Sequence, residues 1–341
     1  MKVRLGLLSR DGGPRDAAVG VVVGKFNPPH LGHLHLIERG AAEVERLYVL
    51  LCDRPDQTLP AERRRAWLQD AVPANATVIV TPDDLPAANE PWARRALEVL
   101  PERPDVAFTS EPWGPGWAAL MGARHVTVDL ARERYPISGT ELRADLGAHF
   151  DRLVPAARAA LARRVVLTGA ESTGKSTLAE ALARALSTVW VPEHGRWYWE
   201  GRRYLADPGW SSDEFVRIAR AQGRLEDDLA RCAAAGVAIA DTDASVTAAW
   251  HERYLGRSDP ALERLATTRV PDLYIVCAAD IPWVQDGTRE SRDHREAMQT
   301  SMERRARASG ARTVVVSGPR EARLEAALTA VRASCRFEEM I

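Results

Sequence analysis

The sequence predicts an α/β protein with two doubly wound parallel sheets, one after the other along the chain. Short apolar runs alternate with helical stretches, and this alternation is typical of a parallel sheet covered by helices on both faces. The alternation pauses near residue 150 and restarts at Val165–Thr168. A chain of 341 residues is also long enough to form two domains rather than one.

Five strands and four helices are expected in the first half of the chain. The strands cover Val19–Val23, Leu47–Leu51, Val78–Thr81, Asp105–Thr109 and His125–Val128. The helices lie between them, at about Leu31–Val44, Ala61–Ala71, Trp92–Leu100 and Trp117–Met121. Strand and helix thus alternate through the whole of this half.

The domain boundary is expected between residues 150 and 162. A mixed stretch, 144–163, contains Pro155 as a break and an alanine-rich helix behind it. We therefore divide the chain into an N-terminal extension (1–18), a first domain (19–150), a linker helix (151–162) and a second domain (163–341). The strands expected in the second domain cover Val165–Thr168, Val189–Val191, Val237–Ala240, Leu273–Cys277 and Thr313–Val316.

The composition points to a folded globular protein without a membrane segment. Hydrophobic residues make up 45% of the chain, which is ordinary for such a protein. A formal net charge of −1 gives no general attraction to nucleic acid or to an acidic membrane. No apolar run approaches the ~20 residues of a membrane helix, and the N-terminus does not read as a signal peptide. The four cysteines include no CxxC pair, so we expect buried thiols in a reducing, cytoplasmic environment.

Lysine is rare in this chain, and two of the lysines lie in phosphate-binding signatures. The chain has three lysines and 43 arginines, and Lys25 and Lys175 each lie in a different signature. A compact ammonium suits a phosphate where a planar guanidinium is not required. Two unlike phosphate sites predict two reactions on nucleotides.

The second signature is a phosphate-binding loop (P-loop). Gly169-Ala170-Glu171-Ser172-Thr173-Gly174-Lys175-Ser176 matches G-x-x-x-x-G-K-[ST] and lies between an apolar strand and a helix. We expect Lys175 to neutralise the β- and γ-phosphates of ATP and Ser176 to hold Mg²⁺. The other loop residues expected to contact ATP are Gly169, Glu171, Ser172, Thr173, Gly174 and Thr177. A glycine-rich turn before an ordinary helix is the competing interpretation.

Two carboxylates follow strands of the second domain. Val237–Ala240 ends at Asp241, the pattern expected of an aspartate that orders Mg²⁺ beside a P-loop, and Asp243 follows at once. The alternative for Asp241 is a turn residue or a helix N-cap. Glu193 lies just beyond another strand, at the carboxyl edge where open α/β sheets bind ligands.

Aromatic residues and arginines near these carboxylates suggest a nucleoside site. The aromatic residues are Trp190, Trp197, Tyr198, Trp199 and Tyr204. They could stack on a flat base, and a place in the core is the alternative. Further on, the segment from Trp283 through Arg289, Arg292 and Arg295 is typical of a lid whose arginines reach the transferring phosphate; a solvated surface loop is the alternative.

The first signature is a strand–turn–helix segment with two histidines. It reads Gly24-Lys25-Phe26-Asn27-Pro28-Pro29-His30-Leu31-Gly32-His33. A Gly-Lys start, a proline-rich turn and Gly32 at a helix N-terminus form an anion site. A metal site is disfavoured because no Cys or close carboxylate completes a ligand set, and His35 fits an ordinary surface histidine. A further segment, Ile137-Ser138-Gly139-Thr140-Glu141-Leu142-Arg143, adds two hydroxyls and an arginine at the start of a helix.

Together these segments resemble a known family. Gly24–His33, with its HxGH core, and Ile137–Arg143 are similar to the two hallmarks of Rossmann-like nucleotidyltransferases that build dinucleotides. Followed by a P-loop kinase, they resemble the bifunctional nicotinamide-mononucleotide adenylyltransferase and ribosylnicotinamide kinase family (the NadR type). The likeness covers nearly the whole chain and includes Thr109-Ser110-Glu111, Glu193–Arg196, Asp241-Thr242-Asp243 and Pro282–Arg289.

The resemblance implies roles for further residues. ATP or substrate contacts are implied for Gly24, Phe26, Asn27, Gly32, Ser110, Ser138, Thr140, Arg196, Arg289 and Arg292. Trp92 is implied to stack on the nicotinamide ring, with a helix-core position as the alternative. The family's Glu-Tyr-Gly-Arg-Asp is here Glu193-His194-Gly195-Arg196-Trp197, so any role of the family's Tyr and Asp does not carry over. Family members can carry an N-terminal helix-turn-helix domain, and about 18 residues before the first strand are too few for one.

The two reactions need different residues. The phosphate that attacks ATP in the adenylyl transfer is ionised at neutral pH and needs donors and cations around the α-phosphate. His30, His33, Lys25 and Arg143 fit that task. The kinase step uses a ribose hydroxyl, which gains from a carboxylate base or anchor, and Glu193 and Asp241 are available for it.

We therefore expect a two-step route from ribosylnicotinamide to NAD. The kinase makes nicotinamide mononucleotide with ATP and Mg²⁺, and the first domain adenylates it with a second ATP and releases pyrophosphate. The alternatives are the same activities on another nucleoside or vitamin, and an NAD-responsive regulator that has lost catalysis. The expected partners are these small molecules, without nucleic acid or membrane insertion, and a homo-oligomer stays open.

Overall fold

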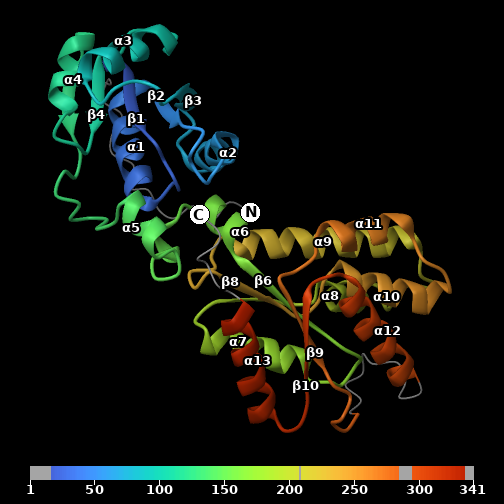
Figure 1. The fold of residues 1–341 in the computed structure, drawn as a ribbon. Helices are drawn as coiled ribbons and strands as arrows, with labels where there is room; N and C mark the ends of the chain where they lie inside the picture. Colours follow the sequence, from blue (N-terminus) through green and yellow to red (C-terminus); the bar gives the residue numbers. More distant parts are fainter. Residues whose placement is uncertain (1–16, 207–208, 284–293, 335–341) are drawn as a thin grey trace. The chain divides into compact units, whose positions relative to one another are not determined.

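The computed structural model describes residues 17–206, 209–283 and 294–334. The chain divides into two compact units, Met1–Leu142 and Arg143–Ile341. Each unit is built around its own five-stranded parallel sheet with helices along it (Figure 1), which confirms the predicted fold class. No helix of the described residues is long and apolar enough to cross a membrane.

The first unit follows the expected alternation. Its elements are β1 (Ala17–Gly24), α1 (Leu31–Glu43), β2 (Val44–Asp53), α2 (Ala61–Ala71), β3 (Ala76–Pro82), α3 (Asn89–Val99), β4 (Val106–Thr109), α4 (Gly114–Met121), β5 (Arg124–Thr127) and α5 (Gly139–Ala144). The strand order is β3-β2-β1-β4-β5, and every pair is parallel. The ends of the predicted elements differ from the observed ones by three residues at most. Helix α5 crosses the division between the units.

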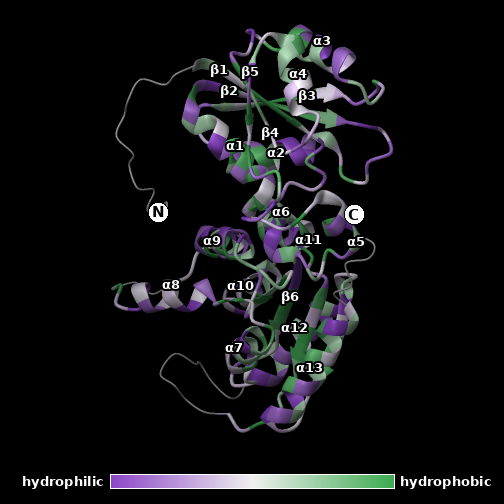
Figure 2. Ribbon diagram, turned by 90° about the vertical axis from the view of Figure 1, so that its left-hand side faces the viewer, coloured by the Kyte–Doolittle hydropathy of each residue, from purple (hydrophilic) through white to green (hydrophobic). Residues whose placement is uncertain are grey.

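The sheet of the first unit is buried on both faces. Successive strand residues point to opposite faces, so Val22 and Val49 pack with α1 and α2, whereas Val21 and Leu50 pack with α3 and α4. In Figure 2 much of the sheet is coloured hydrophobic, whereas the helices carry both hydrophilic and hydrophobic residues. Burial on both faces explains why the central strands β1 and β4 are apolar runs without alternation.

The second unit repeats this plan with a different strand order. Its elements are η1 (Phe150–Arg152), α6 (Pro155–Leu161), β6 (Arg163–Thr168), α7 (Lys175–Ala185), β7 (Val189–Val191), α8 (His194–Arg202), α9 (Ser212–Ala230), β8 (Val237–Ala240), α10 (Ala244–Leu255), α11 (Pro260–Thr268), β9 (Leu273–Cys277), α12 (Arg295–Ala308), β10 (Arg312–Val316) and α13 (Arg320–Ser334). The order is β10-β9-β6-β8-β7, all parallel. Strands β7, β8 and β9 have the predicted bounds.

Helices also cover both faces of the second sheet. Leu178 and Leu182 of α7 pack with α13 against one face. Leu225 of α9 and Ala306 of α12 pack against the other. The first strand of each sheet, β1 or β6, is central and leads at its carboxyl end into one of the two phosphate signatures, where open α/β sheets bind ligands.

Candidate active sites

Two histidines hold each other at the start of α1. The backbone N–H of His33 donates to His30 Nδ1 at 3.3 Å, and the N–H of His30 donates to His33 Nδ1 at 3.3 Å. Their rings stack with centroids 3.5 Å apart. Because each Nδ1 accepts a hydrogen bond, a neutral ring carries its proton on Nε2. The HxGH turn therefore presents two imidazole donors at a helix N-terminus, where an anion is favoured.

Both histidines are neutral at pH 7. Burial lowers the pKa of His30 to about 4, with a smaller contribution from the Arg132 cation and an opposing one from Glu141. The pKa of His33 is also far below its ordinary value, because of burial and the neighbouring His30 and Arg132. Donors and cations were expected around the α-phosphate of ATP. His30 and His33 are therefore among the uncharged donors. The influence of Glu141 on His30 also shows that the two signatures of the first unit lie close together.

Gly32 lies close to the His30 ring. A Cβ at this position would lie 3.1 Å from Cε1 and Nδ1 of the His30 ring. That spacing is tighter than an ordinary Cβ contact, so a side chain at this position would require the His30 ring to shift by a few tenths of an ångström. The glycine of the HxGH signature thus serves the placement of His30.

A fully buried arginine forms hydrogen bonds with the backbone around the first phosphate signature. The guanidinium of Arg64, on α2, donates to the carbonyl oxygens of Lys25 at 2.5 Å, Leu59 at 2.8 Å and Cys52 at 3.1 Å, and it pairs with Asp53. These bonds fix the direction of the turn that follows β1. This role could not be predicted from the sequence, because Arg64 lies in a run of three arginines on a helix rich in charged residues.

The remaining residues predicted for the first site have varied surroundings. Lys25 is exposed, and its Nζ lies 3.4 Å from Asp83 Oδ2. The Ser138 hydroxyl accepts a bond from the N–H of Glu141 at 3.2 Å and so caps the short helix α5. Trp92 packs at the edge of the core around α3 and α4, which fits its core alternative.

The other predicted residues of this site lie on neighbouring segments. Gly24 ends β1, Phe26 is buried beside Gly24 and Asn27 is buried in the turn. Ser110 directly follows β4. Thr140 and Arg143 are exposed on α5, and Arg143 falls on the second unit's side of the division.

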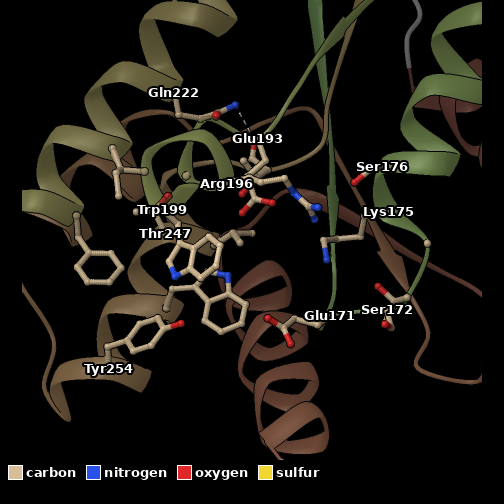
Figure 3. A pocket seen from close by; sticks show the side chains of 18 of the residues that line it. Glu171, Ser172, Lys175, Ser176, Glu193, Arg196, Trp199, Gln222, Thr247 and Tyr254 are labelled. Carbon is tan, nitrogen blue, oxygen red and sulfur yellow. Dashed lines mark hydrogen bonds between the residues drawn. The ribbon is translucent and has the colours of Figure 1, made fainter. Parts of the chain in front are cut away.

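The second unit contains a cavity of about 310 Å³ beside the P-loop. Its lining joins the P-loop, α8, α9 and α10: Glu171, Ser172, Thr173, Gly174, Lys175, Ser176, Thr177, Glu193, Gly195, Arg196, Trp199, Trp210, Phe215, Ile218, Gln222, Thr242, Val246, Thr247, Trp250 and Tyr254. In Figure 3, Trp199 and Tyr254 lie on one side, Lys175 and Ser176 on the other, and Glu193 and Arg196 point between them. The cavity therefore has a phosphate end and an aromatic end.

The P-loop has the backbone that its sequence predicts. Gly169 has φ 137° and Gly174 has φ 80°, values that favour glycine. A Cβ on Gly169 would also lie 2.7 Å from the carbonyl oxygen of Cys277. Lys175 Nζ and the hydroxyl of the buried Thr173 both donate to the carbonyl of Ala170, at 2.9 and 2.8 Å.

Three side chains that come after β9 in the sequence form hydrogen bonds with the backbone of this loop. Arg323 donates to the carbonyl of Thr173 at 3.0 Å and Arg295 to that of Ser172 at 3.0 Å. Gln299 accepts from the N–H of Ala170 at 2.9 Å and donates to the carbonyl of Cys277 at 3.2 Å. Arg295 was expected in a lid and instead bonds to the loop backbone. Arg289 and Arg292, the other arginines of that expected lid, lie outside the described residues.

Glu193 and Asp241 come together near the P-loop lysine. Burial raises the pKa of Glu193, Lys175 opposes this rise, and the charge of Asp241 adds to it. Asp241 is 3% exposed, and its Oδ1 has no hydrogen-bond partner among the described residues. A buried carboxylate oxygen without a donor is suited to a cation. The described residues contain no group of three or more His, Cys, Asp or Glu that could hold a metal ion.

Asp243 has the N-cap role that was the alternative for Asp241. It accepts a bond from the N–H of Val246 at 2.9 Å at the start of α10, and its other oxygen bonds to the Tyr274 hydroxyl. Asp243 therefore caps α10, and the Asp241 carboxylate remains available to the candidate site.

The aromatic end of the cavity differs from the predicted cluster. Of the predicted residues only Trp199 lines the cavity; Trp190 packs on the core, and Trp197 and Tyr204 are exposed. Tyr198 donates to Glu214 at 3.3 Å. The other aromatic lining residues are Trp210, Phe215, Trp250 and Tyr254. Two pairs of lining residues could have been predicted from the sequence. Trp250 and Tyr254 are four residues apart on α10, and Phe215 and Gln222 are seven apart on α9, so each pair lies on one face of its helix.

Both units of the chain are similar to known proteins. Residues 21–145 match the model of the cytidylyltransferase-like family, and residues 164–323 match that of an AAA domain. The trifunctional NAD biosynthesis/regulator protein NadR of Escherichia coli K12 is 28% identical over 293 residues, which cover 80% of this chain and 71% of that protein. The protein of the same name from Salmonella typhimurium LT2 is 27% identical over 297 residues, 81% of this chain and 72% of that protein.

Solved structures share the fold over most of the chain. A crystal structure of NadR in complex with NAD and AMP-PNP has a TM-score of 0.67 at 22% identity and covers 93% of this chain and 96% of its own. A crystal structure of NadR in complex with NR has a TM-score of 0.69 at 22% identity, with 96% and 97% covered. At this identity the likeness establishes the arrangement of elements in both units.

Proposed function

Because this chain is a homologue of the NadR proteins over four-fifths of its length, we propose that it is a bifunctional enzyme of NAD biosynthesis. The second unit is a ribosylnicotinamide kinase, and the first is a nicotinamide-mononucleotide adenylyltransferase. The observation that carries the kinase assignment is the cavity that joins a P-loop to an aromatic end, with Glu193 between them.

The cavity suits a nucleoside with a cationic base. The nicotinamide of ribosylnicotinamide is a pyridinium, and a cation is attracted to the faces of Trp and Tyr rings. With the base at the aromatic end, the ribose lies near Glu193 and Arg196, and the phosphates of ATP lie at the P-loop. This order places the sugar hydroxyl between the base and the phosphate that it accepts.

Glu193 is the proposed base or anchor of the kinase step. The nucleoside hydroxyl oxygen forms a bond to the γ-phosphorus of ATP, the bond from that phosphorus to the β,γ-bridging oxygen breaks, and ADP leaves. The hydroxyl proton passes to the Glu193 carboxylate. Its raised pKa makes this carboxylate a better proton acceptor than an ordinary one. Lys175 and the N–H groups of the P-loop stabilise the phosphate oxygens.

Mg²⁺ would be held by Asp241 and Ser176. It would neutralise charge on the phosphates of ATP. The buried Oδ1 of Asp241 supports this assignment. The other P-loop residues and Arg196 form the remaining ATP and nucleoside contacts.

The adenylyl step is supported by the paired histidines. A phosphate oxygen of nicotinamide mononucleotide bonds to the α-phosphorus of ATP, and pyrophosphate leaves. Both reactants are already ionised, so the residues needed are donors for the oxygens that gain charge. The Nε2–H groups of His30 and His33 fill that role, and Lys25 and Arg143 supply positive charge. We place this pathway in the cytoplasm, where ATP is available.

Two substitutions test the assignment of one activity to each unit. Lys175→Ala should abolish phosphorylation of ribosylnicotinamide and leave adenylyl transfer unchanged, and His33→Ala should do the reverse. Loss of one transition-state donor costs about a hundredfold to a thousandfold in rate. Each step is followed separately by the mass of its product, after incubation with ATP, Mg²⁺ and the nucleoside or its phosphate. A folded variant that loses both activities contradicts the two-site assignment.

A further inference from the structure

Gln222 is a buried polar side chain that touches both segments carrying the kinase carboxylates. It lies on α9, is 1% exposed and lines the cavity. Its Oε1 accepts from the backbone N–H of His194 at 2.9 Å, and its Nε2 donates to the backbone carbonyl of Thr242 at 3.4 Å. Figure 3 shows it beside Glu193.

Each of these partners is the immediate neighbour of a carboxylate residue. His194 follows Glu193, and Thr242 follows Asp241. Strands β7 and β8 are paired up to Val191 and Ala240, and the N–H of Asp241 donates to the carbonyl of Val191 at 3.0 Å. Beyond that bond the two segments leave the sheet. The Gln222 carboxamide connects them at the level of Glu193 and Asp241.

A carboxamide is suited to this bridge because it offers a donor and an acceptor at one short, rigid end. Both of its polar atoms are used by backbone groups of the two segments. Helix α9 is itself fixed, because Arg269 from the far end of α11 bonds to the carbonyl of Gly223 at 3.0 Å and to Glu226 at 3.1 Å. The bridge is therefore attached to a rigid part of the unit.

We propose that Gln222 is a positioning residue of the kinase, which sets the distance between Glu193 and Asp241 by bridging the backbone beside each of them. This proposal rests on the kinase function assigned above. It predicts that loss of the bridge lowers the rate of phosphoryl transfer more than it weakens binding of the nucleoside. A residue that recognised the nucleoside directly would show the opposite pattern.

Two variants remove the bridge in different ways. Gln222→Met has similar length and no hydrogen-bonding group at its end. Gln222→Glu keeps the size and an acceptor for the N–H of His194, but it places a carboxylate oxygen against the carbonyl of Thr242. The matched control is Arg220→Met, an exposed residue of the same helix.

The expected result is a fall in kinase kcat of about tenfold to a hundredfold in both Gln222 variants, since small displacements of reacting groups have effects of that size. The KM for the nucleoside and its dissociation constant without ATP, measured by calorimetry, should change less than threefold, a small change on the scale of about 1.4 kcal/mol per tenfold. Adenylyl transfer and the control variant should match the wild type, and thermal unfolding should show a folded second unit.

A rise in the nucleoside KM with kcat unchanged overturns the proposal and makes Gln222 a recognition residue. Unchanged kinetics in both variants also overturns it. The wild-type protein is assayed first with ribosylnicotinamide and then with other nucleosides. If ribosylnicotinamide fails, the substrate assignment is wrong, and the Gln222 comparison is made with whichever nucleoside is phosphorylated.

Discussion

Glu193 and Asp241 are both carboxylates near Lys175, and their surroundings predict different effects when each is neutralised. Asp241→Asn should raise the Mg²⁺ concentration that the kinase requires and weaken its use of ATP, because its buried oxygen is the proposed metal ligand. Glu193→Gln should leave that Mg²⁺ requirement nearly unchanged and lower kcat by about a hundredfold to ten-thousandfold, the range of a general base. Initial rates across Mg²⁺ and ATP concentrations separate the two. If only Glu193→Gln shifts the Mg²⁺ requirement, the roles must be exchanged.

The buried histidine pair predicts how adenylyl transfer depends on pH. A histidine of ordinary pKa loses its proton near pH 6.5. Since the pKa of His30 is lowered to about 4 and that of His33 is also far below normal, both stay neutral between pH 6 and 8. The rate from nicotinamide mononucleotide at saturating ATP should therefore show no step from a histidine in that range. A rate that falls as pH rises through 6.5 would instead identify a protonated histidine as the active form.

At the scale of elements, each phosphate signature has a buried arginine that donates hydrogen bonds to its backbone carbonyls. Arg64 bonds to carbonyls around the turn after β1, and Arg323 bonds to carbonyls around the P-loop. Lysine keeps the charge but cannot make this many bonds in a fixed plane. Arg323→Lys should lower kinase kcat/KM for ATP by about tenfold or more and leave adenylyl transfer unchanged, and Arg64→Lys should do the reverse. Equal losses of both activities in either variant would indicate general destabilisation instead.

The sequence predicted the elements better than it predicted the cavity wall. Strands such as β8 and β9 are short apolar runs, so local pattern alone locates them. The P-loop and the HxGH turn are also local signals. Trp210, just before α9, and Tyr254, on α10, reach the cavity through tertiary packing, which the sequence around Glu193 does not reveal. Arg64 and Arg323 are buried, and in a chain with 43 arginines their sequence does not distinguish them from surface ones.

At the scale of the whole molecule, the division between the units falls inside a segment that we propose takes part in adenylyl transfer. The second hallmark runs from Ile137 to Arg143, and the compact units divide after Leu142. A fragment of residues 1–157 keeps all of α5 and should convert nicotinamide mononucleotide to NAD. A fragment of residues 1–142 lacks Arg143 and should be slower by about a hundredfold, the effect of one lost phosphate contact. Circular dichroism checks that both are folded; a folded but inactive 1–157 fragment would show that the boundary or the assignment is wrong.

The aromatic end of the kinase cavity has an optical consequence. Trp199, Trp210 and Trp250 are three of the ten tryptophans of the chain, and all three line this one cavity. A pyridinium ring that stacks on an indole accepts charge from its excited state, so the emission of these residues should dim when the nucleoside enters. The enzyme then carries its own fluorescent reporter of the kinase site, and occupancy can be followed in stopped flow without a label.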